Sequence, residues 1–209
     1  MAEWVWNVAS ARYHDLATGR FMARSEVLGY VDDSLAASGR VSDTLARFVA
    51  DGTLSPADWR NAMRQELKEQ YITEYLAGRG GVEQMTQADW GSIGGSLAEQ
   101  YRYLDGFTDD IATGELSEAQ IRARAKMYVN SAREAHERGY ARAANEAGLT
   151  EVKWTLNPAV ENCPDCIAFA SLGWQPVEDD PYGGCYPGSG CTVCLTNCAC
   201  SLEYRESEA

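Results

Sequence analysis

The sequence predicts a mainly α protein, an antiparallel helical bundle with an N-terminal β-hairpin and a small, zinc-stapled C-terminal β/loop module. Three observations predict this class. Helix-start patterns recur 31 residues apart, apolar residues follow them at helical spacing, and all seven cysteines lie between Cys163 and Cys200. A chain of 209 residues can bury a sizeable core. We expect a hairpin over 1–24, a helical domain over 25–150 and a Cys-rich zinc-binding module over 151–209.

The first 24 residues have the pattern of a β-hairpin. Trp4, Trp6 and Val8 alternate with other residues, as on one face of a strand. Turn-forming residues follow from Asp15 to Gly19, before a second short apolar run. The sequence therefore predicts two strands joined by this turn.

Residues 25–52 have helical periodicity. Ser38 and Gly39 interrupt the pattern, so we expect one long or broken helix that ends at Gly52. The apolar residues near one helical face are Val27, Val31, Leu35, Val41, Leu45 and Phe48.

Three further helix starts share one capping pattern. Ser55, Thr86 and Ser117 each precede an apolar stripe and can accept a hydrogen bond from a free backbone N–H group. A polar residue three positions later resembles the second half of a capping box. The three repeats of this pattern lack sustained sequence identity, which favours a helical bundle over a solenoid. Trp59 and Trp90 are expected in the core, although either could instead be exposed and contact a partner protein.

The third of these helices carries small residues and many charges. Its small residues would let a neighbouring helix approach closely; the seam consists of Ile121, Ala125, Tyr128, Ala132, Ala135, Gly139 and Ala143. Six basic residues between Arg122 and Arg142 alternate with glutamates, including Glu134 and Glu137. We interpret them as a solvated face with helix ion pairs. A nucleic-acid contact strip is the alternative.

The cysteines form a metal-ligand pattern. Two thiolates in Cys163-Pro164-Asp165-Cys166 can take adjacent corners of a zinc tetrahedron, and a second group can supply the others. The candidate metal ligands are Cys163, Cys166, Cys194, Cys198 and Cys200. We assign Cys163 and Cys166 as ligands, and Cys194, Cys198 and Cys200 are the alternatives for the remaining coordination positions. A four-sulfur zinc site is closed to catalytic water, which indicates a structural role.

Two cysteines are left over, and two other interpretations compete. Cys185 and Cys191 are the spare thiols, which could pair as a disulfide. A redox Cys-x-x-Cys would need a βαβ frame and a helix beginning at the first Cys, and the sequence does not predict either. His14 and His136 are expected to be ordinary polar residues, not ligands.

Charge and motifs limit the function classes. The formal net charge of −13 opposes sequence-wide binding to nucleic acid or to an anionic membrane, so nucleic acid is not expected as a specific ligand. The sequence contains no nucleophile elbow, phosphate-binding loop or zinc-protease signature. It also lacks a long apolar span and a signal-peptide pattern. We therefore expect a non-enzymatic protein made in a cytoplasm.

The C-terminal pattern resembles a known family. An Ala-rich helix is followed by Trp154, by the Cys163 and Cys166 pair and by Asn197-Cys198-Ala199-Cys200. Over roughly residues 117–204 this order is similar to the head-morphogenesis, or minor head protein, family of tailed bacteriophages. In that comparison Cys194 takes the family's His-or-Cys position. Ala199 departs from it, since the family usually has Arg or Lys there.

The resemblance implies a low-copy structural protein of the virion, located in the head or at the portal vertex and acting in head assembly. Its expected partners are the phage portal protein and, as a further candidate, the major capsid protein. Two alternatives come from other classes. One is an intracellular zinc-ribbon adaptor that contacts nucleic acid or protein; the other is a thiol oxidoreductase that uses Cys163 and Cys166.

Overall fold

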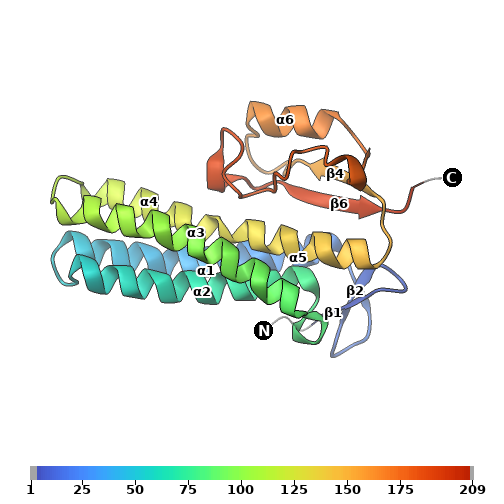
Figure 1. Cartoon of the computed structure of the whole chain (residues 1–209), viewed down its shortest axis with the longest axis horizontal. Coiled ribbons are helices and arrows are strands. Elements are labelled where there is room, and N and C mark those ends of the chain that lie inside the picture. The colour runs from blue at the N-terminus through green and yellow to red at the C-terminus, as the bar shows by residue number, and fades with distance from the viewer. Residues whose placement is uncertain (1–3, 208–209) are drawn as a thin grey trace.

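The computed structural model describes residues 4–207 and has the predicted mainly α architecture. Long helices lie side by side, the C-terminal module covers one side of α5, and the N-terminal strands pack at one end of the bundle (Figure 1). The long helices are α1 (Arg24–Ala50), α2 (Pro56–Arg79), α3 (Gln87–Ala112), α4 (Glu118–Asn130) and α5 (Ala132–Glu146). Within the described residues, no helix is long and apolar enough to cross a membrane.

The N-terminal segment forms three strands, not the predicted pair. The strands β1 (Trp4–Asn7), β2 (Arg12–Asp15) and β3 (Phe21–Met22) pair antiparallel in the order β1-β2-β3. The additional turn lies between Asn7 and Arg12, where Ala11 takes a left-handed conformation with φ of 49°. The predicted turn from Asp15 to Gly19 joins β2 to β3.

This small sheet belongs to the helical core. Trp4, Trp6 and Tyr13 are buried with Val27 and Tyr140. The Tyr13 hydroxyl donates a 2.5 Å hydrogen bond to the carbonyl of Gly78, near the end of α2. The strands therefore close one end of the bundle.

Helix α1 runs without a break through Ser38 and Gly39. Ser38 is buried, and its hydroxyl donates to the Glu66 carboxylate on α2. This contact satisfies a polar side chain inside an apolar face. The alternative of a broken helix is wrong because a partner on the next helix accommodates the polar residue.

The three predicted caps are confirmed. The side chains of Ser55, Thr86 and Ser117 accept hydrogen bonds from the backbone N–H groups three residues later, at 3.1, 3.3 and 3.3 Å. Each helix thereby gains a partner for one of its free N–H groups.

Of the two tryptophans expected in the core, one is at the surface. Trp59 is fully buried, but Trp90 is 40% exposed. Asp89 turns inward in the first turn of α3, where it is 1% exposed and accepts a hydrogen bond from Tyr75. Since adjacent helical residues point about 100° apart, the inward Asp89 leaves Trp90 facing solvent.

The third predicted helix is two helices that meet at Ser131. The Ser131 hydroxyl lies 2.6 Å from the Tyr128 carbonyl and 2.8 Å from the Tyr71 hydroxyl.

The predicted close approach of a neighbouring helix occurs between α5 and α2. A Cβ atom on Gly139 would overlap the Tyr75 carbonyl, and one on Gly78 would overlap the His136 carbonyl. The two backbones are therefore in direct contact.

The charged residues of α4 and α5 form ion pairs, but not all on a solvated face. Arg122 pairs with Asp43, Arg124 with Asp110, Arg133 with Asp32, Arg138 with Glu134 and Arg142 with Glu146. Glu137, however, is fully buried. It pairs with Arg24 at 3.0 Å and accepts the backbone N–H of Leu202 at 3.1 Å. The expectation of a wholly solvated face is wrong here because the C-terminal module covers this side of α5.

The C-terminal module is a small antiparallel sheet with one helix and loops. Its elements are β4 (Glu151–Thr155), α6 (Pro164–Ser171), β5 (Gln175–Pro176) and β6 (Ser201–Arg205), with strand order β5-β4-β6. Trp154 is 1% exposed and packs against Phe169 and Tyr182. The Tyr182 hydroxyl accepts the backbone N–H of Trp154 at 2.7 Å. The module thus has an apolar core of its own beside the cysteines.

Candidate metal centre

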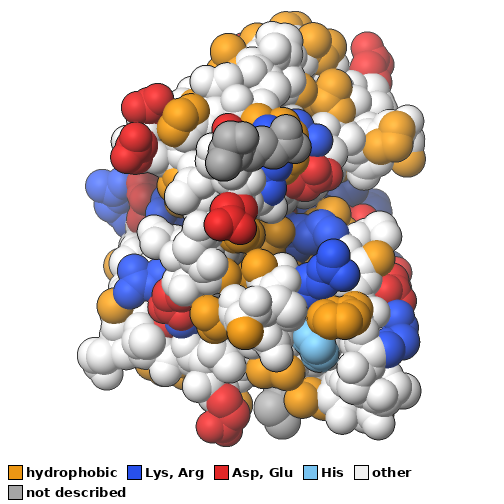
Figure 2. Space-filling view, turned by 90° about the vertical axis from the view of Figure 1, so that its right-hand side faces the viewer, with side chains coloured by type: hydrophobic (Ala, Val, Ile, Leu, Met, Phe, Trp, Pro, Cys, Tyr) orange, Lys and Arg blue, Asp and Glu red, His pale blue; other side chains and the backbone are white. Residues whose placement is uncertain are grey.

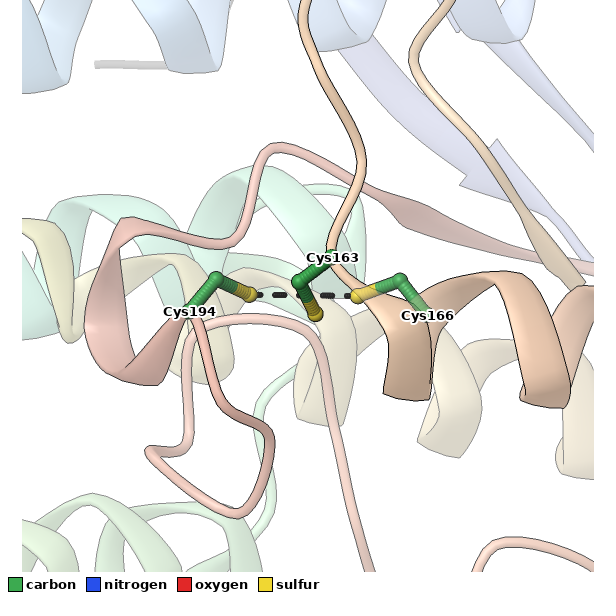
Figure 3. A group of neighbouring side chains, drawn as sticks. All are labelled: Cys163, Cys166 and Cys194. Atoms are coloured by element: carbon green, nitrogen blue, oxygen red, sulfur yellow. Dashed lines mark hydrogen bonds between the residues drawn. The ribbon is translucent and has the colours of Figure 1, made fainter.

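The five predicted metal-ligating cysteines lie together in the module. Their sulfur atoms form two groups, Cys163 with Cys166 and Cys194, and Cys166 with Cys198 and Cys200. Within each group the sulfurs lie within 4.8 Å of one another, and Cys166 belongs to both. Figure 3 shows the first group, in which the side chains of Cys166 and Cys194 point toward each other across Cys163. The five thiols, which lie up to 37 positions apart in the sequence, thus form two groups joined at Cys166.

Local structure places each thiol. Cys163 is the N-cap of α6, and Cys166 lies in the first turn of that helix. Cys194 and Cys198 flank the short 3₁₀ helix η3 (Leu195–Asn197), and Cys200 directly precedes β6. Because β6 pairs with β4, the sheet holds the last two cysteines against the start of α6.

One expectation about this segment is wrong, since a helix does begin at the first cysteine. Pro164 occupies the first helical turn, where its missing N–H group costs nothing, and it favours a helix that starts at that point. The sheet beside it is antiparallel and has no parallel βαβ unit among residues 4–207. A helix that begins at the first cysteine is therefore a feature in common with redox Cys-x-x-Cys proteins, but the parallel βαβ arrangement of those proteins is not found among the described residues.

The surroundings favour thiolates at two positions. The side-chain hydrogen bond from Cys198, with a contribution from Trp154, lowers the pKa of Cys200 to about 6. Burial opposes ionisation of Cys163, yet the backbone N–H groups of Cys166 and Cys194 lower its pKa. The thiolate is the form that binds a metal ion.

Sequence reasoning missed three polar residues around the thiols. Asn162 Oδ1 lies 3.5 Å from Cys200 Sγ, and Thr192 Oγ1 lies 3.1 Å from Cys194 Sγ. Asp165 Oδ2 accepts the backbone N–H of Val193 at 2.8 Å, which ties the Cys194 loop to α6. Each stands one or two residues from a cysteine, a position typical of groups that orient metal ligands.

Two of the sulfur–sulfur distances approach those around a tetrahedral metal ion. The sulfurs of Cys166 and Cys198 are 3.5 Å apart, and those of Cys166 and Cys194 are 3.8 Å apart. Thiolates at about 2.3 Å from one zinc ion would lie about 3.8 Å from each other. Each group supplies three thiols, so a closed four-sulfur site would need a fourth thiol from the other group. The cysteine cluster could therefore hold a metal ion.

The other candidate residues lie outside this cluster. Cys185 and Cys191 are joined as a disulfide, which is the pairing left open by the sequence. His14 packs its ring against Phe21 in the N-terminal sheet. His136 is fully buried in α5, and its Nε2 atom lies 2.6 Å from Nη1 of Arg24. Neither histidine belongs to the groups of potential ligands.

Comparisons with known proteins find no match for this chain. No protein-family model, curated protein or solved structure is similar enough. The conclusions about the site therefore rest on the residues and geometry of this chain.

Proposed function

We propose that this chain is a structural, non-enzymatic minor head protein of a tailed bacteriophage, bound near the portal vertex. It is made in the host cytoplasm and carried in the virion. The observation that carries the proposal is the gathering of the residues of the family pattern: Trp154 lies in the same buried cluster as Cys166, Cys198 and Cys200.

We also propose zinc as the metal of the site, with a structural role. Cys163 and Cys166 would hold it together with two of Cys194, Cys198 and Cys200. Four thiolates would close the coordination shell, so the ion would join the loops to α6 and β6. In isolated zinc modules such binding supplies folding free energy on the order of 10 kcal/mol.

The charge of the module favours a protein partner over nucleic acid. Residues 151–209 carry two basic and nine acidic side chains, hence a net charge of −7. A site of four thiolates and one zinc ion would add about −2. Such a surface favours a basic partner surface and repels a phosphate backbone.

The outer side of the module also offers apolar contacts. Ile167 on α6 and Leu172 just after it are 52% and 47% exposed. Figure 2 shows hydrophobic side chains gathered at the top of that view, over the module. Exposed apolar groups of this kind suit a protein interface.

The alternative adaptor that contacts nucleic acid has less support. The arginines of α4 and α5 that would form its contact strip each pair with a carboxylate. Salt-sensitive DNA binding that is lost on charge reversal of Arg122 and Arg142 would favour the adaptor over the virion protein.

Native mass spectrometry tests the proposal. The full chain would be measured alone and mixed with the portal subunit from the same genome. We expect one zinc ion per chain and a portal-bound species, and we expect the chain in purified virions. Cys166→Ser should lose the zinc, whereas the matched double variant Cys185→Ser/Cys191→Ser should keep it. A chain that is absent from virions and does not bind the portal would overturn the virion assignment, and a metal-free chain would overturn the zinc assignment.

A further inference from the structure

A cleft separates the module from the helical domain on the side of α1. It has a volume of about 760 Å³. One wall is α1, the second is the α4–α5 junction, and the third is the loop around η3, from Thr196 to Ala199. The Asn130 amide donates a 2.8 Å hydrogen bond to Asn197 Oδ1, which connects the last two walls. Clefts of this size at the boundary of two domains are common binding sites.

The cleft is basic in an acidic protein. Its lining contains four basic residues, Arg40, Arg47, Lys126 and Arg133, against two acidic ones, Asp32 and Asp43. The lining therefore has a net charge of +2, whereas the whole chain has −13. This reversal of sign attracts an anionic group to one place on the surface.

Two of these basic side chains have no acidic partner. Arg133 pairs with Asp32, and Arg47 lies 3.8 Å from Asp43. Among residues 4–207, no ion pair involves Arg40 on α1 or Lys126 on α4, and both side chains are exposed. Their charges are therefore available to a ligand.

The third wall contains a buried polar atom, and the floor is apolar. The Thr196 hydroxyl oxygen is buried and has no hydrogen-bond partner within the described chain. Leu35, Ala36 and Gly39 line the cleft from α1, and a Cβ atom on Gly39 would meet nothing within 4 Å. The cleft thus combines separated cations with space above a small apolar surface.

We propose that this cleft binds an acidic peptide segment of a partner protein, in which carboxylates face Arg40 and Lys126 and an apolar side chain rests near Gly39. A few carboxylates match a net charge of +2. A long nucleic acid does not, because it would continue from the cleft onto the acidic surface of the module. The inference does not depend on the virion assignment, since it rests on the lining of the cleft.

A peptide-display selection tests this directly. A random dodecapeptide library would be selected against the full, metal-loaded chain, and the recovered peptides would be synthesised with a fluorescent label. We expect enrichment of peptides with two or more Asp or Glu residues and at least one apolar residue. Their affinity should fall as salt concentration rises, because the attraction is electrostatic and partly exposed.

Two variants connect such binding to the cleft. Arg40→Glu/Lys126→Glu should weaken binding of the recovered peptides by about tenfold or more through loss of charge complementarity. Gly39→Phe should weaken it by filling the cleft without a change of charge. Lys68→Glu, an exposed lysine on α2 outside the cleft, is the control for a single charge reversal and should leave affinity unchanged. Thermal melting of each variant verifies that it is folded.

The proposal would be overturned if selection enriches no acidic peptides, or if the recovered peptides bind the Gly39→Phe and charge-reversed chains as well as the original. A single-stranded DNA oligonucleotide that binds more tightly than the peptides, and loses affinity in the same variants, would assign the cleft to nucleic acid instead.

Discussion

Glu74 shows how one residue can make stability depend on pH. It is fully buried in α2 and accepts a 2.8 Å hydrogen bond from Gln70, while its Oε2 atom has no partner in the described chain. Burial raises its pKa to about 8 from an ordinary value of 4.5. The carboxyl group is therefore largely protonated in the folded protein at pH 7.

The consequence is a loss of stability as pH rises. Between pH 4.5 and 8 the folded state keeps a proton that the unfolded state releases, so the free energy of unfolding falls across this window. From pH 5.5 to 8 the loss is on the order of 3 kcal/mol. Glu74→Gln should remove it and be the more stable protein at pH 8.

Urea unfolding at both pH values measures this effect. Glu69→Gln, an exposed position on the same helix, is the control and should follow the original chain. Parallel pH profiles for the original chain and Glu74→Gln would show that Glu74 is already ionised in the folded state.

Gly139 is the residue that permits backbone contact between α2 and α5. A Cβ atom there would overlap the Tyr75 carbonyl and lie 3.0 Å from the Arg79 backbone nitrogen. Gly139→Ala should lower the free energy of unfolding by about 1–3 kcal/mol, because the helices must separate. Gly91→Ala on α3, where nothing lies within 4 Å, should instead raise it by up to about 1 kcal/mol. Urea denaturation distinguishes the two, and equal effects would contradict the close packing.

At the scale of elements, the start of α3 links local capping to long-range burial. Thr86 and Asp89 form a capping box, and Asp89 also lies 3.4 Å from Arg79 at the end of α2. The Asp89 side chain therefore belongs both to the capping box of α3 and to an ion pair between α3 and α2. The same three-residue spacing at Ser117 makes a box that is exposed.

Loss of the Thr86 side chain should destabilise the protein. Thr86→Ala removes the acceptor for the Asp89 N–H group and should cost about 1 kcal/mol in free energy of unfolding. Thr44→Ala removes a hydroxyl that makes only exposed contacts within α1, with the Arg40 carbonyl and the Arg47 side chain, and should be within about 0.5 kcal/mol of the original. Amide exchange in the first turn of α3 should accelerate in the Thr86 variant. Unchanged exchange there would mean that Asp89 alone holds the turn.

At the scale of the whole molecule, the module has its own core but shares contacts with the bundle. Among the described residues, the main helical core contains none beyond Ala135, while the module core contains Trp154 and the five free cysteines. Tyr204 on β6 packs against Tyr140 on α5, and the buried Glu137 accepts the Leu202 N–H group. A structural change in the module should therefore affect these contacts between β6 and α5, not the centre of the bundle.

Metal removal tests this division. If the cysteines hold a metal ion, a strong chelator should accelerate amide exchange across 151–205 and expose Trp154, while helical circular dichroism changes little. The Cys185→Ser/Cys191→Ser double variant should respond to chelator in the same way, since this disulfide lies outside the thiol cluster. Simultaneous loss of all helical signal would contradict independent cores.

The sequence by itself determined the features that depend on neighbouring residues. Ser55, Thr86 and Ser117 start helices because side chains three residues apart satisfy free backbone groups wherever the chain goes. The spacing of the cysteines likewise anticipated the thiol cluster, because Cys163 and Cys166 are one helical turn apart.

Only the tertiary structure decided which polar groups are buried and where a helix bends. The sequence predicts Glu137 to be a surface charge, yet the module covers this residue and supplies the Leu202 N–H group as its hydrogen-bond donor. Ser131 ends α4 beside the Tyr71 hydroxyl, and the inward Asp89 turns Trp90 to solvent. In each case a residue 14 or more positions away provides the partner. Local patterns hold no information about such partners, because burying a polar group is favourable only where the fold brings a matching group to it.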